Sequence, residues 1–394
     1  MSDMRLIVQA DPGAGYRARR SDIDAAIARA LASGWYILGQ EGAAFEAEFA
    51  AWLGGEQTRA VGCANGTDAL ALALRALGIG TGSLVATVSH TAVATVAAIE
   101  MVGATPLLLD VDPTTYTLDV AELEAVLLRP LPGLPPLRAV VVVHLYGQPA
   151  NMDPILDTCR RHGVVVIEDC SQAHGAMYHG RRVGTLADIA AFSLYPTKNL
   201  GALGDAGVVT TGDATLAASL VSLRQYGWRE RYVSAEPGIN SRLDEVQAAV
   251  LRAKLLGLDA DNLRRNSIAA RYDDALGVGV ISPPIRRAGC THVFHQYVVR
   301  VPERTSVQAT LRARGVATAV HYPVPVHLQP AYAGRVPLGP GCCAVAEEIG
   351  GQIMSLPMFP ELTDDQVDRV CEALADLQRQ LTPAPEVQRL LQSA

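Results

Sequence analysis

The feature that most limits the possible folds of this chain is an alternation of apolar runs and amphipathic stretches over residues 59–211. Most of the runs lack the polar alternation of a half-exposed strand. They read AVGCAN, LVATV, TPLLLDVD, AVVVVHLYG, VVVIEDC, IAAFSLY and AGVVTTG. Stretches with helical spacing, such as GTDALALALRALG, separate many of them. The alternation predicts an α/β fold in which helices cover both faces of a mostly parallel, seven-stranded sheet.

The same reading divides the chain into two domains. We expect residues 1–255 to form a large domain that begins with a helical segment at residues 20–54, broken near its glycines. The stretch RLDEVQAAVLRAKLLGLDADNLRRNSIAARYDDAL predicts one long connecting helix near residues 242–277. Residues 256–394 are then expected to form a smaller α+β domain, with strands at HVFHQYVVRV and VATAVHY.

Composition excludes several classes of function. The net charge is −7 at pH 7 and the chain shows no basic stripe, which argues against binding to nucleic acid or to a membrane surface. The seven cysteines have no metal-type spacing, so we expect no metal site and reduced thiols. The N-terminal sequence MSDMRLIVQADPG does not resemble a signal peptide, and we expect a cytoplasmic protein.

The first motif with chemical content is NGTDAL at residues 65–70, where a strand is expected to lead into a helix. Gly66 and Thr67 would place free backbone N–H groups at the start of that helix, which is a natural site for a phosphate. An ordinary helix cap formed by Asn65 or Thr67 is the alternative interpretation.

The second motif is VVVIEDCSQAHGA at residues 164–176, in which an apolar strand ends at Glu168 and Asp169. Ligands of open α/β sheets bind outside the carboxyl ends of the strands, so a carboxylate there faces a ligand cation. A capping aspartate is the alternative.

The third motif is AFSLYPTKNLGALGDAGVV at residues 191–209, whose one lysine, Lys198, has no charged neighbour before Asp205. A desolvated lysine amine is a nucleophile that forms Schiff bases with carbonyl compounds. A solvent-facing loop lysine is the alternative. A phosphate site, a strand-end carboxylate and such a lysine together are what pyridoxal 5'-phosphate requires, with Ser193 and the helix start holding its phosphate.

These motifs resemble those of the DegT/DnrJ/EryC1/StrS family of sugar aminotransferases. The likeness extends from GWYILGQEGAAFEAEFA to SLPMFPELTDDQ and includes HTAVATVAAIEMVGATPLLLDVD, VVVHLYGQPANMDPI, GINSRLDEVQAAVLRAKL and HYPVPVHLQPAY. The resemblance implies the aspartate-aminotransferase-like fold, known as fold type I. It also implies that Lys198 holds pyridoxal 5'-phosphate as an internal aldimine and carries the proton during catalysis.

The resemblance assigns further cofactor contacts. Asp169 pairs with the pyridinium nitrogen and Gln172 lies near the ring oxygen. Gly66, Thr67 and Ser193 bind the phosphate. Asn240, in GINSRLDE, reaches the phosphate from a partner subunit, so a homodimer with shared active sites is expected.

Other site residues have open alternatives. Many family members place an aromatic ring over the cofactor at a position that aligns with Ala92 or His90; we expect His90 to stack there, or else to be a hydrogen-bonding residue at a strand end. The candidates for the substrate cleft are His321, Tyr322 and His327, each of which is alternatively a packed or capping residue. Those for the substrate diphosphate are Arg224, Arg229 and Arg231, of which at least one is expected in a solvated loop.

The resemblance finally predicts the reaction. We expect transfer of an amino group from L-glutamate to a nucleotide-linked keto-6-deoxysugar, with dTDP as the nucleotide and C3 as the carbon that is aminated. A subgroup that dehydrates sugars has histidine where this chain has Lys198, which favours transamination. Amination at C4, a related dehydratase and a regulatory protein that retains the cofactor site are the alternatives.

Overall fold

The computed structural model describes residues 6–54, 57–129 and 131–381. Its large sheet has seven strands in the order β1-β9-β8-β5-β4-β2-β3. They are β1 (Arg59–Cys63), β2 (Leu84–Val88), β3 (Thr105–Leu109), β4 (Leu137–Val143), β5 (Val165–Asp169), β8 (Ile189–Ser193) and β9 (Gly207–Thr211). Strand β9 pairs antiparallel with β1 and β8, and the remaining pairs are parallel. The predicted mostly parallel, seven-stranded sheet is confirmed.

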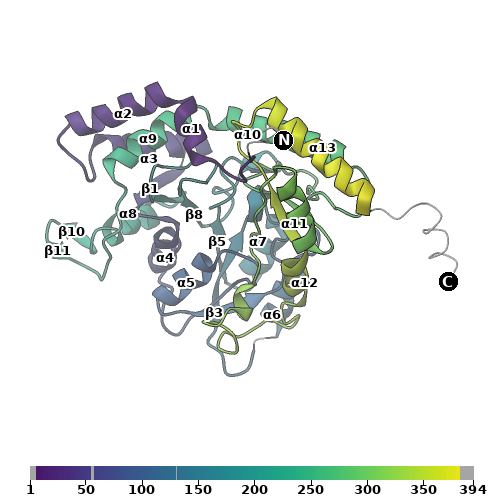
Figure 1. The fold of residues 1–394 in the computed structure, drawn as a ribbon. Coiled ribbons are helices and arrows are strands. Elements are labelled where there is room, and N and C mark those ends of the chain that lie inside the picture. Colours follow the sequence, from purple (N-terminus) through teal and green to yellow (C-terminus); the bar gives the residue numbers. More distant parts are fainter. Residues whose placement is uncertain (1–5, 55–56, 130, 382–394) are drawn as a thin grey trace.

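Successive residues of the central strands pack into two cores, one on each face of the sheet. Val140 and Val142 of β4 face a core that includes α6 (Val120–Leu128), α7 (Met152–Arg161) and α12 (Ala344–Gln352). Ala139 and Val141 face a core with α4 (Gly66–Ala76), α5 (Val93–Met101) and α8 (Ala214–Leu223). Figure 1 shows helices on both sides of the sheet. Because both faces are buried, the strands are apolar at nearly every position.

The remaining elements lie before, after and between these. The N-terminal helices are α1 (Pro12–Ala18), α2 (Arg20–Ala32) and α3 (Gln40–Leu53). The later elements are α9 (Glu245–Leu255), α10 (Leu258–Leu276), β12 (Tyr297–Arg300), α11 (Arg304–Ala313), β13 (Ile353–Leu356) and α13 (Asp364–Leu381). The short elements are the 3₁₀ turns η1 (Leu145–Gly147) and η2 (Val326–Leu328) and the hairpins β6 (Met177–Tyr178) with β7 (Arg181–Arg182) and β10 (Trp228–Glu230) with β11 (Val233–Ser234).

Two local predictions were wrong. The single long helix near residues 242–277 is two helices, α9 and α10, which are separated at Leu256 and Gly257. A Cβ atom on Gly257 would lie 2.7 Å from the guanidinium of Arg19, so the N-terminal segment packs against the chain at this break. The stretch VATAVHY makes only isolated bridges, between Val316 and Ile7 and between Ala319 and Ser355.

Part of the chain after the proposed division at residue 255 packs in the core of the large sheet. Val326, Ala346 and Ile349 belong to the core that contains β4. Leu338 forms a parallel bridge with Leu108 of β3. The exact boundary stays a prediction, but this returning segment packs on the large sheet, as the position of α12 in Figure 1 shows. Within the described residues, no helix combines the length and the apolarity that crossing a bilayer requires.

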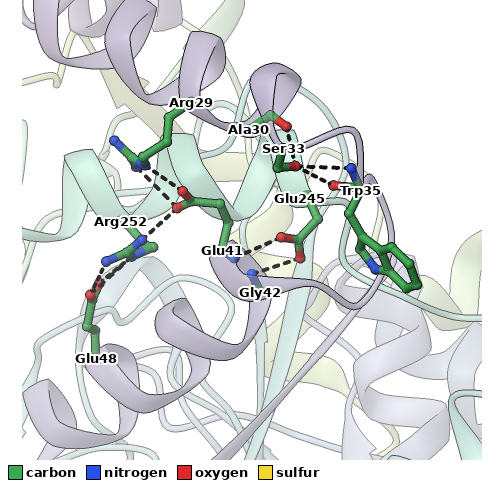
Figure 2. A network of polar contacts seen from close by, with 9 residues as sticks. All are labelled: Arg29, Ala30, Ser33, Trp35, Glu41, Gly42, Glu48, Glu245 and Arg252. Carbon is green, nitrogen blue, oxygen red and sulfur yellow. Dashed lines mark hydrogen bonds and ion pairs between the residues drawn. The ribbon is translucent and has the colours of Figure 1, made fainter.

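A buried carboxylate ties the N-terminal helices to α9 (Figure 2). Helix α3 begins at a glycine cap with no side chain to accept its first N–H groups. Glu245 of α9 accepts hydrogen bonds from the N–H groups of Gly39, Glu41 and Gly42, at 2.8–2.9 Å. The side chain of Glu41 in turn pairs with Arg29 and Arg252. A carboxylate at a helix start satisfies free donors and interacts favourably with the helix dipole.

We therefore predict that Glu245→Ala lowers the free energy of unfolding by about 3 kcal/mol, because three N–H donors, two of them buried, lose their carboxylate acceptor. Chemical denaturation followed by circular dichroism would measure the change. Glu48→Ala is the matched control, because Glu48 pairs with Arg252 but its side chain is 42% exposed. The control should cost less than about 1 kcal/mol. Equal losses in the two variants would contradict the capping role of Glu245.

Candidate active site

The carboxyl ends of the strands that run the same way bring three separate sequence motifs to one edge of the sheet. β1 leads into α4, β5 ends at Asp169, and β8 ends at Ser193. A cavity of about 300 Å³ opens there. Its lining includes the predicted residues Gly66, Thr67, Asp169, Gln172, Ser193 and Lys198. The structure therefore brings these six predicted residues together.

The start of α4 forms one end of the cavity. The side chain of Asn65 accepts a hydrogen bond from the N–H of Asp68 at 2.8 Å, so Asn65 is indeed the helix cap. Within the described part of the chain, the N–H groups of Gly66 and Thr67 have no acceptor. A Cβ atom on Gly66 would lie 2.5 Å from the Cβ of Ser193, so glycine is needed for this close approach. Two free N–H groups at a helix start fit an anionic group.

Asp169 provides a buried carboxylate in the wall of the same cavity. Its side chain accepts a hydrogen bond from the Thr95 hydroxyl at 3.0 Å and another from the N–H of Ser171 at 3.1 Å. The residue is only 4% exposed. A buried carboxylate held in place by two donors fits a ligand that presents a cationic N–H group.

Lys198 is one of only two lysines in the chain. The ammonium group of the other, Lys254, donates a hydrogen bond to the carbonyl of Gly201 at 2.5 Å. Lys198 is half-buried and lines the cavity, and no hydrogen-bond acceptor for its amine lies among the residues that the structure describes. Burial lowers the pKa of Lys198 from 10.5 to about 8, against the opposing effect of the Asp169 carboxylate. An amine with a lowered pKa is suited to nucleophilic attack.

The lowered pKa of Lys198 predicts how the cofactor-free protein reacts with added pyridoxal phosphate. Only the neutral amine attacks, so the second-order rate constant should rise about tenfold per pH unit below pH 8 and level off above it. Stopped-flow absorbance between pH 6 and pH 10 would measure the profile. Lys254→Arg should leave the profile unchanged. A rate constant that still rises steeply to pH 10 would show that Lys198 titrates like an exposed lysine.

A chain of hydrogen bonds holds Gln172 beside the cavity. Its side-chain oxygen accepts a hydrogen bond from the N–H of Tyr146 at 2.7 Å. Its amide nitrogen donates to the Tyr322 hydroxyl at 3.2 Å. Tyr146 has a φ of +59°, a conformation that costs energy for a non-glycine residue and recurs at functional sites. The strained residue aims its N–H at Gln172 and thereby orients that side chain.

The expectation that His90 stacks on a ligand ring was wrong. His90 is fully buried, and its Nε2 atom lies 2.7 Å from the Tyr146 hydroxyl. Its neighbours Thr91 and Ala92 line the cavity instead. Burial lowers the pKa of His90 to about 4. His90 is therefore the hydrogen-bonding residue that the alternative interpretation described, and its ring is buried in the core and does not line the cavity.

The three arginines proposed for the substrate diphosphate fall into two groups. The role predicted for Arg224 was wrong. Its side chain is buried, forms an ion pair with Glu46 at 2.5 Å, and donates a hydrogen bond to the carbonyl of Gly62 at 2.7 Å. These contacts fix the N-terminal helix α3 to β1 and leave Arg224 no access to the cavity. Arg229 and Arg231 are exposed on the hairpin β10–β11, so their substrate role stays a prediction.

The residues proposed for the substrate cleft are also separated by the structure. Tyr322 reaches Gln172, and the Nδ1 atom of its neighbour His321 lies 2.8 Å from the Ser355 hydroxyl. His327 is buried between Ser89 and Glu347, so it is the packed residue of the alternative interpretation. Asn240 is exposed and does not line the cavity of its own chain. Its proposed contact with a partner's phosphate stays a prediction.

One further cluster has the composition of a metal site. His144, Glu168 and Cys170 bring potential ligand atoms within 4.8 Å of one another. Both ring nitrogens of His144 are already hydrogen-bonded, one to Glu168 and the other to the N–H of Ala150. The Glu168 carboxylate also accepts the N–H groups of Gly184, Leu186 and Ala187. These bonds engage the ligand atoms of His144 and Glu168, and they make Glu168 a support for the loop before β8.

A model of the DegT/DnrJ/EryC1/StrS aminotransferase family matches residues 18–375. The chain belongs to this family. A transaminase of Streptomyces venezuelae, named for dTDP-3-amino-3,4,6-trideoxy-alpha-D-glucose, is 47% identical over 93% of this chain and 94% of the relative. The erythromycin biosynthesis sensory transduction protein EryC1 of Saccharopolyspora erythraea is 45% identical over 92% of this chain and 97% of the relative.

A solved structure agrees with this assignment. The crystal structure of S. venezuelae DesV in complex with a ketimine intermediate superposes with a TM-score of 0.90 at 45% identity, covering 95% of this chain and 99% of that one. Membership of the DegT/DnrJ/EryC1/StrS aminotransferases confirms the predicted family, fold class and enzyme class. The family and its solved structures imply pyridoxal phosphate as the cofactor.

The residues present in this aminotransferase fit that cofactor. The free N–H groups at the start of α4 suit its phosphate, and the buried Asp169 suits its protonated ring nitrogen. Lys198 has a neutral fraction at physiological pH and lines the same cavity. The chain offers no second free lysine, because Lys254 is already bonded to Gly201.

Sequence reasoning missed two residues that shape the site. Thr95 holds Asp169, yet it lies in α5 and is separated from Asp169 by 74 positions. Tyr146 orients Gln172 and carries the strained backbone. A tyrosine directly after an apolar strand end, in HLYG, was the only available signal for Tyr146. No local pattern marks Thr95, because its partner becomes a neighbour only in the folded sheet.

Proposed function

We propose that this aminotransferase moves the amino group of L-glutamate to C3 of a nucleotide-linked keto-6-deoxysugar, with dTDP as the nucleotide. The observation that carries the proposal is the unpaired amine of Lys198 in the cavity that the buried Asp169 and the start of α4 also line. The printed name of the 47% identical relative supports the nucleotide, the class of sugar and the carbon.

The roles of the chain's own residues follow from their positions. When bound, the cofactor supplies an electron sink. Lys198 holds it and, through Nζ, takes the proton from the α-carbon of the amino donor. Asp169 favours the protonated form of the ring nitrogen, and Thr95 and Ser171 keep its carboxylate in place. The N–H groups of α4 and the Ser193 hydroxyl orient the phosphate.

Absorbance spectroscopy of the purified protein tests the proposal directly. The visible band of the lysine-bound cofactor should disappear when L-glutamate is added and return when a dTDP-linked 3-keto-6-deoxysugar follows. A return with the 4-keto sugar alone would assign amination to C4. A stable band in the presence of every amino donor would favour the regulatory alternative, which the name of the 45% identical relative suggests. A dehydrated product of altered mass would identify a dehydratase.

We also propose a homodimer in which Asn240 completes the partner's phosphate site. Asn240 is exposed, and it bridges Gln225 next to the projecting hairpin β10–β11 (Figure 1). The loop after α2 exposes apolar side chains, with Trp35 62% and Tyr36 52% exposed. An exposed apolar group of this kind is suited to burial in an interface.

Mixing two inactive variants tests the shared site. Asn240→Ala should weaken retention of the cofactor, and Lys198→Ala should remove its attachment. A hybrid dimer has one site with both changes and one with neither, so it should regain the activity of about one of its two sites. Activity after co-refolding of the two variants is the measurement. If hybrid dimers form and stay as inactive as the parents, each site is built from one chain.

A further inference from the structure

Three side chains form a continuous hydrogen-bonded chain next to the active site but outside its cavity. The Nδ1 atom of His327 lies 2.6 Å from the Ser89 hydroxyl, and its Nε2 atom lies 3.0 Å from a carboxylate oxygen of Glu347. Ser89 is fully buried and His327 is 7% exposed. We call Ser89, His327 and Glu347 the anchor. Its order of groups is that of a serine hydrolase triad, but the hydroxyl has no access to a substrate.

The anchor joins three segments that are remote in the sequence. Ser89 directly follows β2, His327 lies in η2, and Glu347 lies in the first turn of α12. Ser89 holds η2 through the backbone as well. Its carbonyl accepts the N–H of Val326 at 3.0 Å, and its hydroxyl accepts the N–H of His327 at 3.3 Å. Ser89 therefore holds the C-terminal end of the segment at residues 321–328.

The other end of that segment meets the active site. The His321 carbonyl accepts a hydrogen bond from the Tyr146 hydroxyl, and the Tyr322 hydroxyl accepts one from the Gln172 amide. Between the two ends, Pro323 and Val324 are exposed. The segment is therefore a short span that is held at Ser89 on one side and at the cavity on the other.

Ser89 also precedes the cavity wall in its own segment, because Thr91 and Ala92 line the cavity. We propose that Ser89 and His327 are positioning residues, which set the distance between this wall and Tyr322 and so hold the Gln172 amide beside the cofactor. The inference rests on the proposed function in one respect, which is that Gln172 lies next to the bound cofactor. The anchor itself exists without any ligand.

Ser89→Ala tests the proposal through two readouts that need no turnover. Hydrogen–deuterium exchange of the cofactor-free protein should show faster exchange at His327, whose N–H loses the Ser89 hydroxyl, and a smaller effect at Val326, whose N–H keeps the carbonyl of residue 89. The dissociation constant for pyridoxal phosphate, from fluorescence titration, should rise about threefold to tenfold, the effect of losing one net hydrogen bond. In a Tyr322→Phe background, Ser89→Ala should add almost nothing to that constant, because the anchor acts through Tyr322.

A second pair of variants covers the case in which Ser89→Ala fails to fold. His327→Asn keeps an amide near the position of Nδ1 and should preserve most of the protection of the segment. His327→Gln places its amide toward Glu347 instead and should lose that protection. Equal exchange in both variants would overturn the anchor.

The outcomes also separate the inference from the proposed function. If Ser89→Ala accelerates exchange but leaves cofactor affinity unchanged, or if its effect adds fully to that of Tyr322→Phe, the anchor is structural and the positioning role is wrong. If the unaltered protein binds no pyridoxal phosphate, the proposed function fails, whatever the exchange data show.

Discussion

Replacing Lys198 by alanine is expected to abolish both the visible absorbance of the bound cofactor and the transfer of amino groups. The substitution removes the only free amine in the cavity and the base that moves the proton. Loss of positioned acid–base catalysis alone costs about 10²–10⁴ in rate, and loss of covalent attachment adds to it. We expect turnover to fall by at least about 10⁴-fold, measured with a coupled assay for 2-oxoglutarate.

The chain supplies its own control for this experiment. Lys254 is the only other lysine, and its amine is bonded to the Gly201 carbonyl outside the cavity. Lys254→Ala should keep the absorbance band and most of the activity. Loss of the band in Lys254→Ala, with retention in Lys198→Ala, would reverse the assignment.

The second largest effect is expected for Asp169→Asn. The protein should still bind the cofactor, because the helix start and Lys198 are intact. Abstraction of the α-proton should slow by about 10²–10⁴-fold, because the neutral amide no longer stabilises a positive charge on the ring nitrogen. Stopped-flow measurement of the glutamate half-reaction separates this step from binding.

Two comparisons sharpen the result. Asp157→Asn changes an exposed aspartate that pairs with Arg160 on the surface, and it should behave like the parent protein. Thr95→Val removes one of the two donors to Asp169 and should give an intermediate rate. If Asp169→Asn reacts with glutamate at the parent rate, the carboxylate does not act on the ring nitrogen.

Much of the fold was predictable because a strand that is buried on both faces is apolar at nearly every position, and this pattern can be read from the sequence. Every strand of the large sheet coincides with a short apolar run, since a strand covered on both faces has no polar side. The exceptions depend on contacts with distant parts of the chain. The predicted long helix breaks at Gly257, where the chain lies against Arg19, and VATAVHY contacts its neighbours only through isolated bridges, one to Ile7 and one to Ser355 of β13.

The residues of the active site also differ in how far the sequence predicts them. Asp169 and Ser193 end strands, Lys198 follows a strand and Gly66 begins a helix. The rule that parallel strands share an edge is enough to gather them. The same rule says nothing about the direction of a side chain. Arg224 and His327 have polar side chains in promising motifs, yet both are bound within the protein.

By itself, the sequence determined the sheet, the order of its elements and the identity of the groups at its carboxyl edge, because each follows from periodicity or from a residue's own chemistry. Tertiary structure alone decided which polar groups reach the cavity. His90 turns away to Tyr146, Thr95 comes in to hold Asp169, and Ser89 ties a distant loop to the site. Each depends on atoms that are far apart in the chain and meet only after folding.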